Sequence, residues 1–263
     1  ATRFRAKNSV SFEAMKVVTG TVLEGKTFNF QLIDDETGKT IQTKSNNDGG
    51  SITFDPIFYY QNENKKDVDK GTFVYTIKEE IKNRAGWTLD TTEYKATAEL
   101  SLNPDKTINV VKHYYKNTVA KENEVAEANV IFENVYEAVG QVDLYAWKKL
   151  VGRDLSENQF SFGLYDNNGK RIATAKNVEA KAGEKAKAVF PTITISLNDL
   201  DAKVSTKRAD GKYEKYYTIK EDIPQGAVLQ SDGSYKKDGY TYDGGAYNVV
   251  VSFSDNGNGT IDS

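Results

Sequence analysis

Two lysines stand on the apolar side of predicted strands in this chain. Lys16 is in phase with the apolar residues of 10–14 at two-residue spacing, and Lys148 is in phase with those of 142–146. Because successive side chains of a strand point to opposite faces, both lysines should face an apolar core. A buried ammonium is costly unless it is neutralised, paired or used in chemistry. The two lysines are therefore the first candidates for a functional site.

Carboxylate and amide side chains share this inward phase. Glu79 is in phase with the aromatic and aliphatic residues before it, Glu221 repeats that pattern in the second half, and Asn134 alternates with apolar neighbours. We expect Lys16, Glu79 and Asn134 to converge inside one core. On these residues alone two interpretations stay open: a buried salt bridge beside an asparagine that satisfies a backbone group, and a reactive site.

The sequence contains an internal repeat. Residues 10–32 align without a gap with residues 142–164, and the sequence YTIKEE at 75–80 recurs as YTIKED at 217–222. The second copy ends at the equivalent of Val110, so it has no counterpart of the strand that carries Asn134. We therefore expect no bond at Lys148 within this chain. Either the chain has been cut inside its second domain, or a strand from elsewhere completes that domain.

The repeat and the length of 263 residues predict two domains, at 1–138 and 139–263, with residues 1–8 as the tail of a preceding repeat. Short alternating runs separated by turns rich in Asn, Asp and Gly predict an all-β fold of two tandem Ig-like antiparallel β-sandwiches. The short junction should place them end to end. Residues 175–188, rich in Ala, Lys and Glu, are expected to form a short helix in a domain-specific insertion.

Composition excludes several classes of function. The chain has 35 basic and 38 acidic residues, so we expect neither nucleic acid nor a membrane surface as a partner. No apolar run approaches the roughly 20 residues that span a bilayer. Cysteine is absent, which excludes disulfides and thiolate sites. His113 is the single histidine, so a Ser-His-Asp triad cannot be present in each of the two repeats. No cofactor and no metal are expected.

The order and inward phase of the three polar residues resemble the intramolecular isopeptide site of CnaB-type domains in Gram-positive pilins, most closely the FctA or T-antigen-like backbone pilins. That pattern has a first-strand Lys, a Glu in Tyr-x-x-x-Glu and an Asn in a last-strand Phe-x-Asn. Here it matches Lys16, Glu79 and Asn134. The resemblance implies an autocatalytic Lys16–Asn134 bond with Glu79 as proton shuttle. It marks Lys148 and Glu221 as the second-domain equivalents, without an Asn partner.

The resemblance also implies a function. It suggests a structural stalk or shaft module of a Gram-positive pilus or cell-wall-anchored adhesin, extracellular and without enzymatic turnover. Its partners would be neighbouring repeats or pilin subunits, with sortase and host surface ligands. The alternative is an adhesin module that binds a host glycan or matrix protein through exposed aromatics, since the chain has 16 tyrosines. A glycosidase is not expected, because its two acids would flank an open cleft.

Overall fold

The computed structural model describes residues 7–61 and 71–263, and the chain forms two compact units. Unit 1 is Ala1–Tyr136 and unit 2 is Glu137–Ser263. The segment expected to be the tail of a preceding repeat falls mostly on residues 1–6, which lie outside the described residues.

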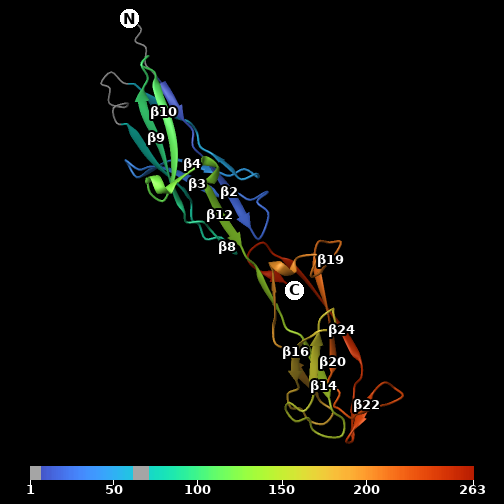
Figure 1. The fold of residues 1–263 in the computed structure, drawn as a ribbon. Coiled ribbons are helices and arrows are strands. Elements are labelled where there is room, and N and C mark those ends of the chain that lie inside the picture. Colours follow the sequence, from blue (N-terminus) through green and yellow to red (C-terminus); the bar gives the residue numbers. More distant parts are fainter. Residues whose placement is uncertain (1–6, 62–70) are drawn as a thin grey trace. The chain divides into compact units, whose positions relative to one another are not determined.

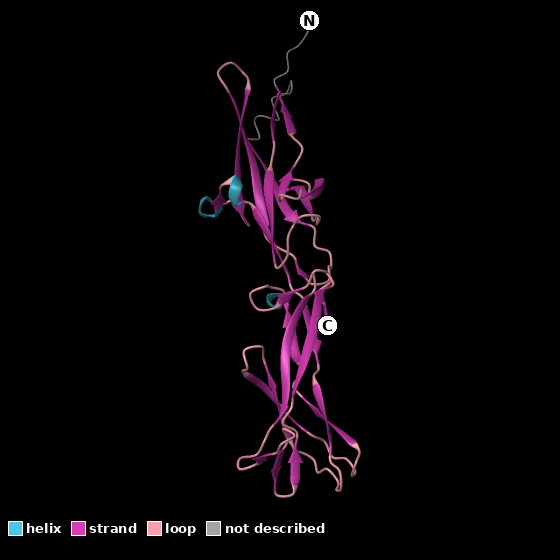
Figure 2. Ribbon diagram, turned by 90° about the vertical axis from the view of Figure 1, so that its right-hand side faces the viewer, coloured by secondary structure: helices cyan, strands magenta, loops and turns pink. Residues whose placement is uncertain are grey.

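Strands and loops make up nearly all of the described chain (Figure 2). The helical elements are single 3-10 turns: η1 (Lys121–Asn123), η2 (Glu127–Asn129) and η3 (Leu197–Asp199). Among the described residues, no helix has the length and apolar character needed to span a bilayer. The all-β prediction is confirmed.

Unit 1 encloses its core between two sheets. The larger sheet has the order β11 (Glu124–Val125), β10 (Ile108–Lys116), β9 (Glu93–Leu102), β7 (Thr72–Glu79), β3 (Asn29–Asp34), β4 (Lys39–Ser45). The smaller sheet has the order β5 (Ser51–Thr53), β2 (Glu13–Thr19), β12 (Ile131–Tyr136), β8 (Trp87–Thr88). A separate pair joins β1 (Lys7–Val10) and β6 (Ile57–Tyr60). Buried aromatic and aliphatic side chains from both sheets form one core cluster.

The pairing of β12 with β2 departs from the antiparallel prediction. These two strands run parallel, with Phe132 opposite Lys16 and Asn134 opposite Val18. They lie side by side in unit 1 (Figure 1). A parallel pairing is possible here because the chain passes through the other sheet between β2 and β12, so no hairpin joins these two strands.

Unit 2 repeats the larger sheet. Its strands have the order β16 (Arg171–Lys176), β15 (Ser161–Tyr165), β20 (Tyr213–Glu221), β24 (Ala246–Asp255), β25 (Ile261–Asp262), with β19 (Thr206–Lys207) also on β20. Two further pairs are β13 (Val139–Val142) with β18 (Ile193–Ser196), and β14 (Tyr145–Lys149) with β17 (Lys185–Val189). A small sheet holds β21 (Val228–Leu229), β22 (Tyr235–Lys237) and β23 (Tyr240–Tyr242).

The two units differ at one sheet edge. Strand β14 corresponds to β2, and its neighbour β17 corresponds to β5. In unit 1 the other side of β2 is paired with β12. In unit 2, every residue of which is described, β14 pairs with β17 alone. The backbone groups on the second edge of β14 thus have no strand partner within unit 2.

The helix expected at 175–188 is wrong. Residues there end β16 and enter β17, with a turn between them. Ala186 and Ala188 are buried and alternate with exposed Lys185 and Lys187. This two-residue period suits a strand with one face in the core, and burial of that face outweighs the helix propensity of Ala and Lys. The segment corresponds to the end of β4 and to β5 of unit 1, with the connection between the two strands longer in unit 2.

Candidate functional site

Three strands place the polar residues of unit 1. Lys16 lies on β2 and Asn134 on the adjacent β12, while Glu79 ends β7 in the facing sheet. Their exposed fractions are 1%, 0% and 2%. The predicted inward orientation of all three is therefore confirmed, and strand alternation is its cause.

Lys16 is paired inside an aromatic pocket. Its Nζ lies 2.6 Å from Glu79 Oε1, and both side chains are fully buried. The same Nζ lies 4.8 Å from the ring centre of Phe28 and 5.8 Å from that of Phe30. Among the described side chains, Glu79 Oε2 and Asn134 Nδ2 are buried and form no hydrogen bond. The Asn134 amide is nevertheless close enough to Glu79 to affect the pKa of its carboxyl, so the two groups share one buried polar pocket.

Burial shifts both ionisable groups towards their neutral forms. Desolvation lowers the pKa of Lys16, although the hydrogen bond and charge of Glu79 oppose that shift. Desolvation raises the pKa of Glu79, against the opposing effects of Lys16 and the neighbouring Asn134 amide. The pocket therefore favours a free amine and a carboxylic acid more than water does.

A fourth residue, missed by sequence reasoning, orients the asparagine. The backbone N–H of Asp90 donates to Asn134 Oδ1 at 2.8 Å. The Asp90 carboxylate accepts the backbone N–H of Glu133 on β12 at 2.8 Å and that of Thr92 at 2.8 Å. Asp90 thus holds β12 by its side chain and the Asn134 carbonyl by its backbone. One signal could have identified it: Asp90 and Asp243 occupy equivalent places in the repeat, four residues before Tyr94 and Tyr247.

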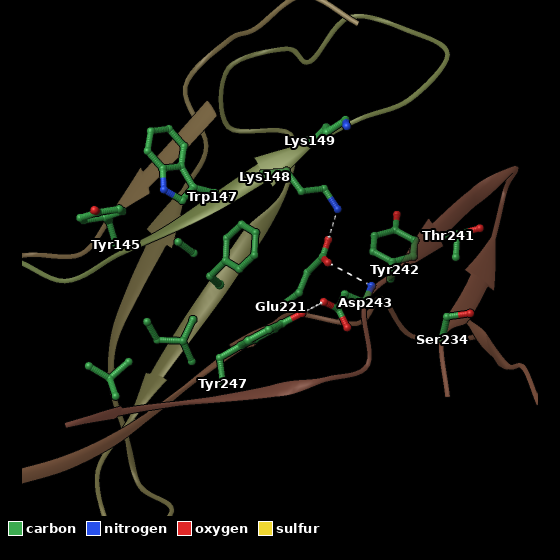
Figure 3. Close-up of a pocket in the computed structure, with 14 residues that line it drawn as sticks. Tyr145, Trp147, Lys148, Lys149, Glu221, Ser234, Thr241, Tyr242, Asp243 and Tyr247 are labelled. Atoms are coloured by element: carbon green, nitrogen blue, oxygen red, sulfur yellow. Dashed lines mark hydrogen bonds and ion pairs between the residues drawn. The ribbon is translucent and has the colours of Figure 1, made fainter. Parts of the chain in front are cut away.

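Unit 2 contains the equivalent ion pair in a more open setting (Figure 3). Lys148 Nζ lies 2.7 Å from Glu221 Oε1, and the residues are 8% and 7% exposed. The backbone N–H of Asp243 donates to Glu221 Oε2 at 3.1 Å, and the Tyr247 hydroxyl donates to Asp243 Oδ2. A cavity of about 690 Å³ borders these residues. No asparagine side chain lines this cavity.

Metal chemistry has no support in the part of the chain that is described. Residues 7–61 and 71–263 contain no group of three or more His, Asp or Glu side chains placed to hold a metal ion. The arrangement in unit 1 instead brings a primary amine, a carboxylic acid and a carboxamide into one buried pocket. Such a set is suited to acyl transfer from the amide to the amine.

Comparison with protein families supports a common origin for the two units. The FctA family model, described as a Spy0128-like isopeptide containing domain, matches residues 12–137 and again residues 144–263. The chain belongs to the FctA family. Lys16, Glu79 and Asn134 lie within the first FctA match, and Lys148 and Glu221 within the second.

Several solved structures are similar to this FctA chain. A major pilin from Streptococcus pyogenes is 16% identical, with 97% of this chain and 98% of that chain covered and a TM-score of 0.34. The major pilin T-13 from the same species is 13% identical, with 99% of each chain covered and a TM-score of 0.36. The Bacillus anthracis TIE protein is 15% identical over 92% of this chain and 31% of that one, with a TM-score of 0.26. Among curated protein sequences, none matches this chain.

Proposed function

We propose that this FctA chain is a structural shaft module of a Gram-positive surface pilus or cell-wall-anchored adhesin, and that unit 1 is closed by a covalent bond between Lys16 Nζ and Asn134 Cγ. One observation carries the proposal. Amine, acid and amide lie together in a pocket without solvent access, and Glu79 Oε2 and Asn134 Nδ2 have no other partner there. Membership of the FctA family, whose model describes an isopeptide containing domain, supports the assignment.

The proposed reaction is a transamidation. Neutral Lys16 attacks Asn134 Cγ, and the developing charge on Oδ1 is stabilised by the Asp90 N–H and by protonated Glu79. Glu79 then gives its own proton to Nδ2 and takes up the proton that the amine loses. The Cγ–Nδ2 bond breaks, ammonia leaves, and a neutral secondary amide remains. No electrons are exchanged and no co-reactant is needed.

The bond would stabilise unit 1 through its topology. It would join the first and last strands of the smaller sheet and close the long loop between residues 16 and 134. Chain-entropy reasoning developed for disulfides gives about 4–5 kcal/mol for such a loop. Tension that enters through β2 and leaves through β12 would pass along the covalent bond. A shaft module in contact with neighbouring pilin subunits, assembled by sortase outside the cell, would use that property, and it would turn over no substrate.

Intact-mass measurement under denaturing conditions tests the bond. The folded chain should weigh less than its sequence mass by one ammonia, and tandem mass spectrometry should locate the link between Lys16 and Asn134. Lys16→Ala, Glu79→Ala and Asn134→Ala should each restore the full mass. Lys148→Ala is the matched control and should keep the deficit. Full mass in the folded parent chain would refute the proposal.

One observation favours the alternative function, binding of a host glycan or matrix protein. Tyr145 and Trp147 are exposed side by side on β14, and Lys187 Nζ lies 4.4 Å and 5.2 Å from their ring centres. Exposed aromatic pairs can stack against sugar rings or bind a partner protein. Glycan and matrix-protein arrays test this function. A binding module should give a signal that Trp147→Ala removes, whereas a shaft module alone should give no signal.

A further inference from the structure

The outer face of the larger sheet, which points away from the core, differs between the two units. In unit 1, three side chains at this face bind one another. The Thr76 hydroxyl donates to Asp35 Oδ1 at 2.6 Å, and Lys95 Nζ donates to Asp35 Oδ2 and to the Thr76 hydroxyl, both at 2.7 Å. The charges of Lys95 and Asp35 are opposite, so this polar group is closed on itself.

Neutral side chains replace that group in unit 2. The repeat places Asn167, Thr218 and Asn248 at the corresponding positions. Thr218 lies opposite Asn248, just as the threonine and the lysine of unit 1 lie opposite each other. All three line a hollow of about 640 Å³ on the outer face of the sheet, and their side chains form no hydrogen bond with any described residue. Two amides and a hydroxyl are therefore available to a ligand there.

Two tyrosines line the same hollow. They are Tyr165 on β15 and Tyr216 on β20, where the repeat has Ile33 and Val74 in unit 1. Tyr216 is 40% exposed, and its hydroxyl donates to Glu214 at 2.6 Å. Strands β15 and β20 each have a paired strand on both sides. The hollow is therefore a feature of side chains on a complete part of the sheet.

The ring of Tyr165 is held in place from below and from one side. Arg171 Nη1 donates to the Tyr165 hydroxyl at 3.1 Å, and the same guanidinium is fixed by both carboxylate oxygens of Asp222. Gly163 lies directly under the ring, because a Cβ there would be 2.7 Å from Tyr165 Cε2 and 2.8 Å from its hydroxyl. Unit 1 has Gln31 at that position. A ring ordered in advance loses little entropy when a ligand binds.

The charges around the hollow favour a neutral ligand. Its lining contains two charged side chains, Lys220 and Asp166, and their signs are opposite. Lys220 Nζ lies 5.1 Å from the ring centre of Tyr165, and Asp166 Oδ1 already accepts two backbone N–H groups of its own turn. A ligand of either charge would therefore meet a group of the same sign.

We propose that this hollow is a binding site for a neutral saccharide. A pyranose has apolar C–H faces and a rim of hydroxyl groups, so it needs aromatic surface and neutral hydrogen-bonding groups side by side. Tyr165 and Tyr216 would contact the sugar faces, and Asn167, Thr218 and Asn248 would bind the hydroxyls. The volume lies in the range of about 300–1,000 Å³ that is usual for ligand sites.

The site is separate from the aromatic pair on β14 and does not depend on the bond proposed for unit 1. Tyr145 and Trp147 belong to a different sheet and do not line this hollow. The mass deficit of unit 1 can be measured on the same samples. Loss of saccharide binding and loss of the covalent bond are therefore distinguishable results.

Saturation-transfer NMR with lactose, cellobiose and maltose tests the proposal on the full chain. At least one of the three should give a signal at about 5 mM saccharide. Tyr165→Ile and Tyr216→Val introduce the residues of unit 1, so they suit the fold, and each should weaken binding about fivefold to tenfold. Asn248→Ala should weaken binding about threefold to tenfold, because it removes hydrogen bonds to the sugar. Tyr115→Ala, on the larger sheet of unit 1, is the matched control and should bind normally.

A positioning variant sharpens the test. Gly163→Ala changes no residue that lines the hollow, but it should displace the Tyr165 ring and weaken binding. The proposal is overturned if none of the three saccharides binds, or if binding survives both tyrosine variants. Binding that Trp147→Ala removes would assign the saccharide to β14 instead, and a preference for sialyllactose over lactose would refute a neutral ligand.

Discussion

Asn46 and Asn177 make the same kinds of hydrogen bond in the two units. Each is buried, and its Oδ1 accepts a backbone N–H, from Phe28 in unit 1 and from Phe160 in unit 2, both at 2.7 Å. Each Nδ2 donates to two backbone carbonyls. The phenylalanine ring fixed in this way lies 4.8 Å from the amine in unit 1 and 4.2 Å in unit 2. The asparagines therefore position the aromatic wall of each lysine pocket.

Replacement of Asn46 should destabilise unit 1. Asn46→Ala leaves a buried N–H and two carbonyls without their partners, so we expect the free energy of unfolding to fall by about 2–3 kcal/mol. Urea unfolding followed by circular dichroism measures the change. Asn109→Ala is the control, since Asn109 is exposed and should lie within about 0.5 kcal/mol of the parent. Equal effects for the two variants would contradict the positioning role.

Bond formation in unit 1 should have a bell-shaped pH dependence. The lowered pKa of Lys16 makes the amine available below the usual value of 10.5, and the raised pKa of Glu79 keeps the acid protonated above 4.5. The rate should fall at low pH as the amine is protonated and at high pH as the acid is lost. Lys16 and Glu79 interact directly, so the two limbs of the profile describe the pair and not either residue alone. Chain synthesised in a cell-free system and shifted to a series of pH values allows ammonia loss to be timed by mass spectrometry, and a rate that is flat with pH would count against Glu79 as the acid.

Loss of the bond should lower the thermal midpoint of unit 1 strongly. Asn134→Ala would remove the proposed loop closure, of about 4–5 kcal/mol, and a hydrogen bond to Asp90 of about 1 kcal/mol. For a domain of this size the midpoint should fall by more than about 10 °C. Asp90→Ala, which breaks hydrogen bonds and leaves the bonding groups in place, provides the comparison. A similar shift for the two variants would mean that hydrogen bonding alone accounts for the effect.

Acid should weaken unit 2 through Asp222. The Arg171 guanidinium donates to both carboxylate oxygens, at 2.7 Å and 2.8 Å, and lowers the pKa of Asp222. This stabilisation is present above the unfolded pKa of about 3.9 and is lost as the pH falls through the lower folded value. Because the pair is partly exposed, it contributes about 1 kcal/mol or less. Asp222→Asn should flatten the acid limb of a pH titration of unfolding, and an acid limb equal to that of the parent chain would contradict the role of this pair.

Strand alternation made much of the site predictable. Lys16, Glu79 and Asn134 were placed inside because each is in phase with apolar neighbours, and Lys148 and Glu221 follow by repetition. Residues 111–137 have no match in the alignment, so no counterpart of Asn134 was expected within residues 139–263. A period of two is a property of the chain itself, so it can be read without knowledge of the partner strands.

The remaining features depend on contacts between distant segments. Asp90 orients Asn134 through its backbone N–H, and a backbone donor has no side-chain signature in sequence, so only the repeated spacing to Tyr94 marked its position. The parallel pairing of β12 with β2 depends on how the two sheets enclose the core. The helix predicted at 175–188 failed because local propensity favoured it, whereas burial of Ala186 and Ala188 against β14 favours a strand.

The position of Asn134 near the end of unit 1 limits when cross-linking can occur during synthesis. Lys16 emerges from the ribosome long before Asn134, and β12 is added to β2 only after the intervening sheet has been made. A chain with a covalent bond between residues 16 and 134 could no longer be fully extended. For the exported module proposed above, a secretion channel that accepts only extended polypeptide would have to act before the proposed bond closes, and unit 1 would mature on the far side of that channel.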